Sequence, residues 1–430
     1  MHPIRWIWFR SKHLARVVTG RNILEPLCIL VIIGVMFTIS LICSQFVYLD
    51  SDDVASFDHT PIKSSIPSVG RVALVLVAHD RPDEFRQTFS SVLKARRFNE
   101  LDLIVSMDFP PAYKTLRSLT MDMTSKVKEL GINPIFWKNP TPGYGIRSSD
   151  LLITQHHRKI FDRGFIEAGY DYLILLETDL TVSEDIFEYF LQAAPILQTY
   201  PIHKPPPTSA DKRKFFCVSA WNDNGMDYHT LSESRLTRTD FFPGLGWMIH
   251  KSTWTEVLRH EWPPGHAYYD DWIRERSSVR TYDCLVPEVS RTHHIARYGV
   301  HVRADPWYDH MVLASGHVAI SQSEYTLVAD SAQYRNRILA ERIENARIIK
   351  WDGQTNIDIP YNQSIVIVFS PPFKSIERLN DMFGFFHRGM RNSFAGLMTA
   401  QLGEQHGRTN VTLVYEPNAA WWGIDVSRIL

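Results

Sequence analysis

The stretch YDYLILLETDLTVSEDIFEYF, residues 170–190, decides the fold of this chain. Its apolar run at 172–176 predicts a buried strand, and three polar residues follow at once: Glu177, Thr178 and Asp179. An acidic helical pattern comes next. This order indicates either an ordinary strand end with a helix cap or a place where a metal and a nucleotide bind.

The sequence before this stretch alternates between apolar runs and amphipathic runs. Continuous apolar runs predict strands at 72–78, 101–107, 133–138 and 171–177, and helical periodicity predicts helices at 82–95 and 150–169. Strands that are apolar at every position must be covered on both faces. We therefore expect an α/β fold with a parallel sheet between two layers of helices.

Charged residues follow three of these strands. They are His79, Asp80 and Arg81 after the first strand, Asp108 after the second, and the 177–179 triplet after the fourth. Ligands of parallel α/β sheets collect beyond the carboxyl ends of the strands, so we expect these side chains to converge on one crevice. The first strand is not followed by G-x-G-x-x-G, which disfavours a dehydrogenase-type dinucleotide site.

The E-x-D at 177–179 has the chemistry of a divalent-cation site. Mn²⁺ and Mg²⁺ prefer carboxylate oxygens together with ligand phosphates and water, so Glu177 or Asp179 can supply the protein ligand. A nucleoside diphosphate leaving group needs such a cation because negative charge grows on the phosphate as the bond breaks. Arg81 is placed to pair with the base or the phosphate end of the nucleotide.

A second pair of carboxylates lies in YYDDW, 268–272. A carboxylate within reach of an acceptor hydroxyl can act as a general base, and aromatic neighbours supply a dry wall and a stacking face for a sugar. The alternative is that an Asp caps a helix running through WIRERSS. Both can hold if the first Asp is free and the second is the cap.

The N-terminus predicts a membrane anchor. Residues 26–49 carry no charge and span roughly 36 Å as a helix, enough for a bilayer core of about 30 Å. Basic residues precede this run and acidic residues follow it, which places 1–25 in the cytosol and the remainder across the membrane. A cleaved signal peptide is the alternative; the length of the run and the absence of a small-x-small site favour a single-pass signal anchor.

The 430-residue length suggests two or three core-bearing units. We expect a stem at 50–70, a main domain at 71–330 and a smaller C-terminal subdomain at 331–430, which starts with a helix at 331–349 and contains strands at 364–370 and 410–416. The segments 215–225, 238–247 and 268–274 lack clean periodicity and are expected to be pocket-building loops, with an exposed linker at 201–214.

The chain has 46 basic and 47 acidic residues and is therefore nearly neutral, so its charge does not indicate a nucleic-acid partner.

Two cysteines, Cys217 and Cys284, lie outside the predicted anchor, in an oxidising compartment if the topology is right. A bond between them would close a long loop and contribute a few kcal/mol. Two sequons, at Asn362 and Asn410, are compatible with glycosylation in the same compartment.

Four strings in this chain closely resemble the N-acetylglucosaminyltransferase I family of the Golgi (glycosyltransferase family 13), the alpha-1,3-mannosyl-glycoprotein 2-beta-N-acetylglucosaminyltransferases. They are CVSAWNDNG (217–225), RTDFFPGLGW (238–247), DDWIR (270–274) and PEVSRT (287–292), and the resemblance covers about 71–310. It implies a GT-A type, Rossmann-like nucleotide-sugar-binding domain and Mn²⁺ as the cofactor.

The resemblance also implies a role for individual residues. It makes Asp179 the sole protein ligand of Mn²⁺ and Asp270 the catalytic base. Contacts to UDP-GlcNAc fall on Arg81, Asp108, His156, Glu177, Thr178, Leu245, Tyr269 and His301. Thr178 replaces an acid of the family, Tyr269 a tryptophan, and His301 a serine on a loop at 297–310 that closes over the donor. The family disulfide maps onto Cys217 and Cys284.

The function implied is inverting transfer of GlcNAc from UDP-GlcNAc to a mannose 2-hydroxyl of a high-mannose N-glycan on glycoproteins, by a single-pass type II protein of the Golgi membrane with a luminal catalytic domain. Two alternatives remain. One is a β-1,2-GlcNAc transferase of O-mannosyl glycans, whose known forms have a longer stem. The other is a catalytically silent glycan-binding paralogue, to which the changes at Thr178, Tyr269 and His301 point.

Overall fold

The computed structural model describes residues 70–79, 81–108, 110–139, 149–198, 214–229, 231–263, 268–275, 282–296, 306–354, 356–359, 361–370, 374–403 and 406–429. These residues belong to one compact unit. The predicted cytoplasmic tail, anchor and stem, the linker at 201–213 and the residues around His301 lie outside the described ranges. Among the described helices, none is both long enough and apolar enough to cross a membrane.

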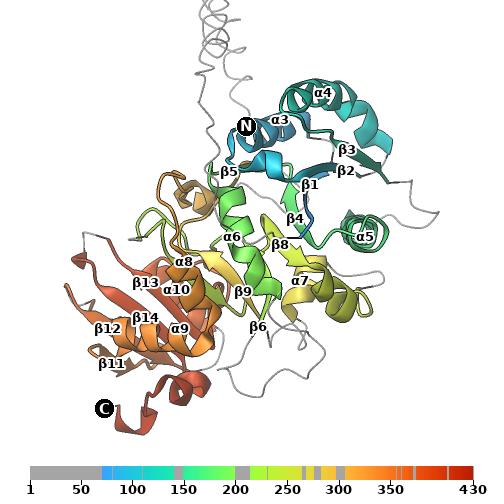
Figure 1. Ribbon diagram of the computed structural model, residues 1–430. Coiled ribbons are helices and arrows are strands. Elements are labelled where there is room, and N and C mark those ends of the chain that lie inside the picture. The colour runs from blue at the N-terminus through green and yellow to red at the C-terminus, as the bar shows by residue number, and fades with distance from the viewer. Residues whose placement is uncertain are drawn as a thin grey trace, which may run out of the picture. The chain divides into compact units, whose positions relative to one another are not determined.

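The centre of the fold is an eight-stranded mixed sheet in the order β3-β2-β1-β4-β8-β6-β9-β7 (Figure 1). Its strands are β1 (Val72–Ala78), β2 (Asp102–Met107), β3 (Ile135–Lys138), β4 (Tyr172–Glu177), β6 (Lys214–Ser219), β7 (Leu236–Thr239), β8 (Trp247–His250) and β9 (Tyr282–Pro287). The strands β3, β2, β1 and β4 are parallel to one another, as the apolar runs predict.

Alternate residues of each central strand pack against opposite helix layers, as the two-residue period of a strand requires. In β1, Leu74 and Leu76 face the cluster formed with α3 (Pro82–Lys94), α4 (Pro110–Glu129), α6 (Ile186–Gln198) and α8 (Gln322–Ala329). Ala73 and Val75 face the opposite cluster, which includes residues of α5 (Ser149–Phe161), the π-helix η2 (Asp162–Glu167), the π-helix η4 (Thr253–Leu258) and α7 (Tyr269–Glu275). The mixed α/β architecture is therefore confirmed.

The predicted parallel strands form only half of the sheet, and the other half is mixed. Strand β8 runs antiparallel to both β4 and β6, and β7 runs antiparallel to β9. The segments 215–225 and 238–247, expected to be loops, supply most of β6, the end of β7 and the start of β8, while 268–274 forms most of α7. These strands are short, and their partners lie far away in the sequence (Thr239 pairs with Cys284), so local periodicity does not reveal them.

A second sheet of four strands lies in the C-terminal part, in the order β11-β12-β14-β13. It comprises β11 (Arg347–Lys350), β12 (Ser364–Phe369), β13 (Leu397–Gln401) and β14 (Asn410–Tyr415), accompanied by α10 (Lys374–Phe383). The helix expected at 331–349 ends earlier: α9 (Ser331–Ile338) continues as a π-helix, η6 (Leu339–Ile343), and β11 follows. Val366, Val368 and Val414 belong to the same buried cluster as Leu74 of the central sheet, while the domain boundary at 331 stays a prediction.

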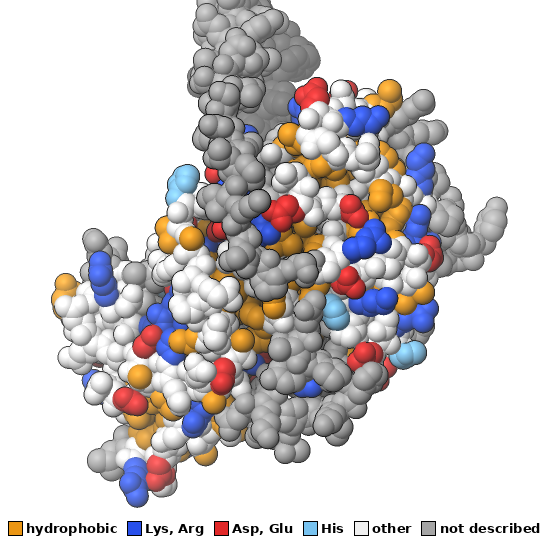
Figure 2. Space-filling view, viewed as in Figure 1, with side chains coloured by type: hydrophobic (Ala, Val, Ile, Leu, Met, Phe, Trp, Pro, Cys, Tyr) orange, Lys and Arg blue, Asp and Glu red, His pale blue; other side chains and the backbone are white. Residues whose placement is uncertain are grey.

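Charged side chains of both signs are interspersed over the face of the molecule shown in Figure 2.

A two-stranded ribbon, β5 (Leu180–Val182) paired with β10 (Thr292–His294), continues the chain directly after the 177–179 triplet. The ribbon brings residues more than a hundred positions apart in the sequence to the carboxyl end of β4.

Candidate active site

Asp179 lies in the turn between β4 and β5 and faces the segment that follows β1. Val77 pairs with Glu177 across the parallel β1–β4 ladder, so the residues after both strands emerge at the same edge. Arg81 Nη1 donates to Asp179 Oδ2 at 2.7 Å, and both side chains are largely buried. The other oxygen, Oδ1, is buried and accepts no hydrogen bond from any described residue. An unpartnered buried carboxylate oxygen is costly unless a cation or donor binds it.

Asp108, at the end of β2, forms the second carboxylate of this edge. Its backbone N–H donates to the Ala78 carbonyl at 3.0 Å, which places it beside the end of β1. The Oδ2 atom lies 2.9 Å from His79 Nδ1, whereas the buried Oδ1 has no hydrogen-bond partner among the described residues. Asp108 and Asp179 therefore flank the end of β1, each with one carboxylate oxygen available to a ligand.

His156 of α5 is the third residue predicted at the nucleotide end. Its Nε2 lies 2.8 Å from Ser106 Oγ, and its Nδ1 lies 3.8 Å from Asp108 Oδ1. Burial lowers the pKa of His156 well below its usual range, and the neighbouring His157 acts in the same direction. A neutral imidazole next to Asp108 can take part in hydrogen bonds to a base or ribose without adding charge.

Thr178 hydrogen-bonds the backbone of β1 through both its side chain and its N–H. Its hydroxyl donates to the Val77 carbonyl at 3.3 Å, and its backbone N–H donates to the same carbonyl at 3.3 Å. The side chain is buried and binds the β1 backbone. Thr178 therefore fixes the turn that presents Asp179.

Glu177 and Tyr269 join this edge to α7. The Tyr269 phenol hydrogen-bonds the Glu177 carboxyl, and burial raises the pKa of Glu177 to about 8, with the carboxylates of Asp179 and Asp270 acting in the same direction. The Tyr269 ring stacks on His157 with a centroid separation of 4.0 Å and is almost fully buried. The ring of Tyr269 is therefore packed inside the protein next to Asp270, while its contact with the donor stays a prediction.

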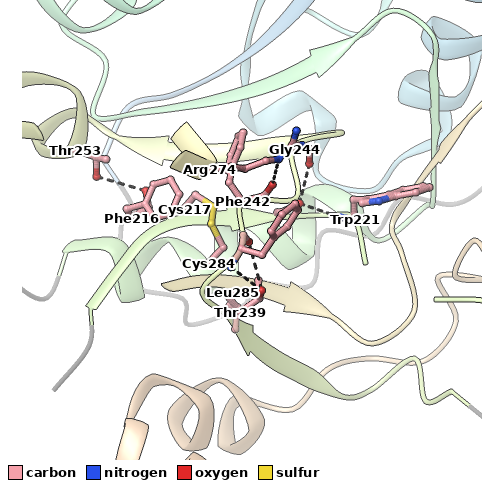
Figure 3. The surroundings of a disulfide bond; sticks show 12 residues. Phe216, Cys217, Trp221, Thr239, Phe242, Gly244, Thr253, Arg274, Cys284 and Leu285 are labelled. Atoms are coloured by element: carbon pink, nitrogen blue, oxygen red, sulfur yellow. Dashed lines mark hydrogen bonds between the residues drawn. A yellow bond between two sulfur atoms is a disulfide. The ribbon is translucent and has the colours of Figure 1, made fainter. Parts of the chain in front are cut away.

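Asp270 is held by a residue that we did not predict, Arg274. The Nη1 of Arg274 lies 2.8 Å from Asp270 Oδ2 and 2.8 Å from Asp271 Oδ1. Its Nε donates to the Phe242 carbonyl at 3.1 Å, as Figure 3 shows beside the Cys217–Cys284 disulfide. Arg274 thus ties the first turn of α7 to the loop that carries Leu245, while Asp270 remains about one third exposed, at 35%.

Leu245 lies in a strained turn. Its φ is +46°, between Gly244 at +69° and Gly246 at +91°, and few non-glycine residues adopt this conformation. Thr292 Oγ1 donates to the Leu245 carbonyl at 2.7 Å and holds the turn in place. A Cβ on Gly246 would lie 2.7 Å from Thr292 Cγ2, so glycine is required there for two reasons.

His294, the last residue of β10, is the second residue that we missed. Its Nε2 lies 3.7 Å from Asp179 Oδ2, and the buried Nδ1 has no hydrogen-bond partner in the described ranges. Burial lowers the pKa of His294, although Asp179 opposes this shift. The i,i+4 spacing of Asp270 and Arg274 is a signal in the sequence for their pairing. No comparable signal exists for His294, because the pairing of β10 with β5 brings it to Asp179.

The residues at this edge suit a divalent cation that takes few protein ligands. Within the described part of the chain, no group of three His, Cys, Asp or Glu side chains could hold a metal ion by itself. Asp179 Oδ1 is nevertheless a carboxylate oxygen that accepts no hydrogen bond in the described part of the chain, which is what a cation bound by one carboxylate and by ligand phosphates needs.

The remaining predicted residues lie elsewhere. Cys217 and Cys284 form a disulfide between the paired strands β6 and β9. Asn362 and Asn410 lie in the C-terminal part, Asn362 in a turn before β12 and Asn410 at the start of β14. His301 is outside the described residues.

Comparisons with known proteins agree with the strings noted above. A family model described as the GNT-I family matches residues 50–401. The alpha-1,3-mannosyl-glycoprotein 2-beta-N-acetylglucosaminyltransferase of Arabidopsis thaliana is 30% identical over 229 residues, 53% of this chain and 47% of that protein, so the chain spans about half the length of this relative. A crystal structure of GalNAc-T7 with UDP, GalNAc and Mn²⁺ aligns with a TM-score of 0.37 and 12% identity, over 64% of this chain and 51% of that one.

Proposed function

The chain belongs to the GNT-I family, and on that premise we propose that it is an inverting glycosyltransferase. It transfers GlcNAc from UDP-GlcNAc to the 2-hydroxyl of a mannose on high-mannose N-glycans. The observation that carries this proposal is the pair of carboxylates at the strand ends. Asp108 and Asp179 each keep one oxygen without a hydrogen-bond partner among the described residues, and they flank the segment of Arg81.

The arrangement around the carboxyl ends of β1, β2 and β4 supports a GT-A type nucleotide-sugar-binding domain. The uridine end of the donor would contact Asp108 and His156, and Arg81 would face the diphosphate. Glu177 and Leu245 would contact the GlcNAc ring. Leu245 is suited to this role because its strained turn, fixed by Thr292, presents its side chain in one orientation.

Asp179 would hold the Mn²⁺ ion through its free oxygen, and His294 lies close enough to orient that carboxylate. When bound, the ion neutralises charge that develops on the departing diphosphate. Arg81 contributes a further positive charge at the same place. It binds Asp179 Oδ2, and Oδ1 has no hydrogen-bond partner among the described residues.

Asp270 would act as the general base. It accepts the proton of the mannose 2-hydroxyl while that oxygen attacks the anomeric carbon from the side opposite to UDP, so the C–O bond to UDP breaks as the new one forms. Arg274 is a positioning residue in this scheme. It fixes the Asp270 carboxylate relative to the Leu245 turn through the Phe242 carbonyl.

The compartment proposed is the Golgi lumen, with the chain anchored as a single-pass type II membrane protein through 26–49. The basic residues before the apolar run and the acidic residues after it support this orientation. The disulfide between Cys217 and Cys284 supports an oxidising compartment for the folded part.

The test is a transfer assay with the full-length, detergent-solubilised chain, UDP-GlcNAc and Mn²⁺. A mannose-terminated N-glycan and an O-mannosyl glycan serve as acceptors, and mass spectrometry detects the product. We expect transfer to the N-glycan and its loss when a chelator removes Mn²⁺. Transfer only to the O-mannosyl glycan would show that O-mannosyl glycans, not N-glycans, are the acceptor. Transfer to neither would favour a catalytically silent paralogue.

The role of Asp270 is tested with a matched pair of variants. Asp270→Asn and Asp271→Asn each remove one charge from a carboxylate that Arg274 binds at 2.8 Å. Loss of a general base lowers kcat by about 10²–10⁴-fold, so we expect that loss for Asp270→Asn. Asp271→Asn should keep most of the activity. Equal kcat values for the two variants would show that Asp270 is not the base.

A further inference from the structure

The two sequons of the chain are not equivalent, because they lie in different surroundings in the C-terminal sheet. Asn362 belongs to a turn before β12, whereas Asn410 is the first residue of β14, between β12 and β13. The parallel pairing of β12 with β14 places Ser364, the hydroxyl residue of the first sequon, opposite Asn410. The two sequons are thus neighbours in space, but only the second has its acceptor asparagine inside the sheet.

The Asn410 side chain is half-buried, and both its nitrogen and its oxygen form hydrogen bonds. Its Nδ2, the atom to which an N-linked glycan would be attached, donates to Ser364 Oγ at 3.1 Å. Its Oδ1 accepts from Gln401 Nε2 at 3.0 Å and from Arg342 Nη1. Gln401 is its register partner on β13, so strands flank Asn410 on both sides.

The rest of the second sequon is buried. Val411 and Thr412 are both 0% exposed, and within the described residues the Thr412 hydroxyl has no hydrogen-bond partner. A glycan on Asn410 would be attached to the nitrogen that donates to Ser364 and would place a bulky polar group next to two paired strands. Because N-glycans are added before the chain is fully folded, a chain modified at Asn410 could not form this sheet.

Asn362 meets the opposite conditions. It is exposed, its φ of +55° is typical of an Asn in a turn, and the flanking Tyr361 and Gln363 are exposed as well. Tyr361 exposes 67% of its surface, an unusual value for a large aromatic side chain. The first GlcNAc of a glycan on Asn362 would lie next to this ring and could cover it by stacking.

We propose that the folded protein carries an N-glycan on Asn362 and none on Asn410. In the reaction, the Asn362 Nδ2 forms a bond to the anomeric carbon of an oligosaccharide carried on a lipid diphosphate. The bond from that carbon to the phosphate oxygen breaks, and one amide proton leaves as the lipid diphosphate is released. The proposal rests on the luminal orientation in the proposed function, but it does not depend on transferase activity.

The experiment expresses the full chain in a eukaryotic secretory system and compares gel mobility before and after enzymatic removal of N-glycans. Asn362→Gln should abolish the mobility shift. Thr412→Val removes the second sequon and keeps the shape of the side chain. It costs no hydrogen bond within the described residues, because the Thr412 hydroxyl makes none there. It should leave the shift of the wild type unchanged.

Mass spectrometry of the deglycosylated wild type locates the site, because glycan removal converts the modified Asn into Asp. We expect conversion at Asn362 only. Conversion at Asn410 in folded protein, a smaller shift for Thr412→Val, or no glycan on the wild type would each overturn the proposal. Transfer activity measured on the same samples reports on the proposed function separately, since neither variant touches the active-site edge.

Discussion

The two halves of the eight-stranded sheet differ in where their charged side chains lie and in whether these are paired. In the parallel half, β3-β2-β1-β4, the carboxylates of Asp108 and Asp179 come after the strand ends, and each keeps an oxygen without a hydrogen-bond partner among the described residues. In the other half, Arg238 of β7 and Asp283 of β9 lie within the strands, 2.7 Å apart and 0% exposed. The first half leaves hydrogen-bonding capacity for a ligand, whereas the second uses its charges and a disulfide to hold the scaffold.

The largest effect is expected from breaking the charge pair in the second half. Arg238→Met leaves the Asp283 carboxylate buried without its guanidinium, which should lower the free energy of unfolding by about 3–5 kcal/mol. Arg238 also donates to the Val328 carbonyl at 2.8 Å, so α8 loses an attachment. Urea denaturation measures the loss. The double variant Arg238→Met/Asp283→Leu should recover part of it, and a double variant less stable than the single one would contradict this interpretation.

In the parallel half, the corresponding change should affect activity and leave stability almost unaltered. Asp179→Asn keeps the shape of the side chain but weakens its hold on a cation, and we expect transfer to fall by about 10²–10³-fold. The unfolding midpoint should change little. Mn²⁺ titration followed by intrinsic fluorescence provides a second readout. An unchanged Mn²⁺ affinity in this variant would show that Asp179 does not bind the metal.

The comparison also predicts how stability depends on pH. Burial lowers the pKa of His157 to about 4 from its usual value near 6.5. Above pH 6.5 the residue is neutral in both states, and below it the unfolded chain gains the proton first. The free energy of unfolding should therefore fall between pH 6.5 and 4, and His157 alone should account for about 3 kcal/mol of this loss. His156 acts in the same direction because burial also lowers its pKa.

Denaturation at a series of pH values tests this dependence. His157→Phe retains a ring that can stack on Tyr269 and cannot be protonated, so its stability should decline less steeply below pH 6.5. The same slope in the variant and the wild type would assign the pH dependence to other groups.

The smallest effect is expected at the Leu245 turn. Gly246→Ala puts a Cβ 2.7 Å from Thr292 Cγ2 at a φ of +91° and should cost about 1–3 kcal/mol in stability. Gly131→Ala is a matched control, since Gly131 has a φ of +76° and no atom within 4 Å of an added Cβ. Thermal unfolding of both variants separates the steric contact from the backbone strain, and equal losses would show that the contact with Thr292 contributes nothing.

Much of the parallel half can be predicted from the sequence. The apolar runs predict β1, β2 and β4 because a strand covered on both faces needs an apolar residue at nearly every position. Because parallel strands end at the same edge of a sheet, the residues after them are also predicted to lie together: Arg81, Asp108 and Asp179. The structure brings Arg81 and Asp179 into direct contact.

The sequence by itself determined the class of fold, the edge where the charges gather and the motifs of the GNT-I family. The tertiary structure decided that β8 runs antiparallel to β4, that His294 reaches Asp179, and that the strand of Asn410 is paired on both sides, with β12 and with β13. The physical reason is the range of the signal. Apolar periodicity reports only whether a segment is buried, whereas these features depend on partners a hundred or so residues away, or on which strands pair.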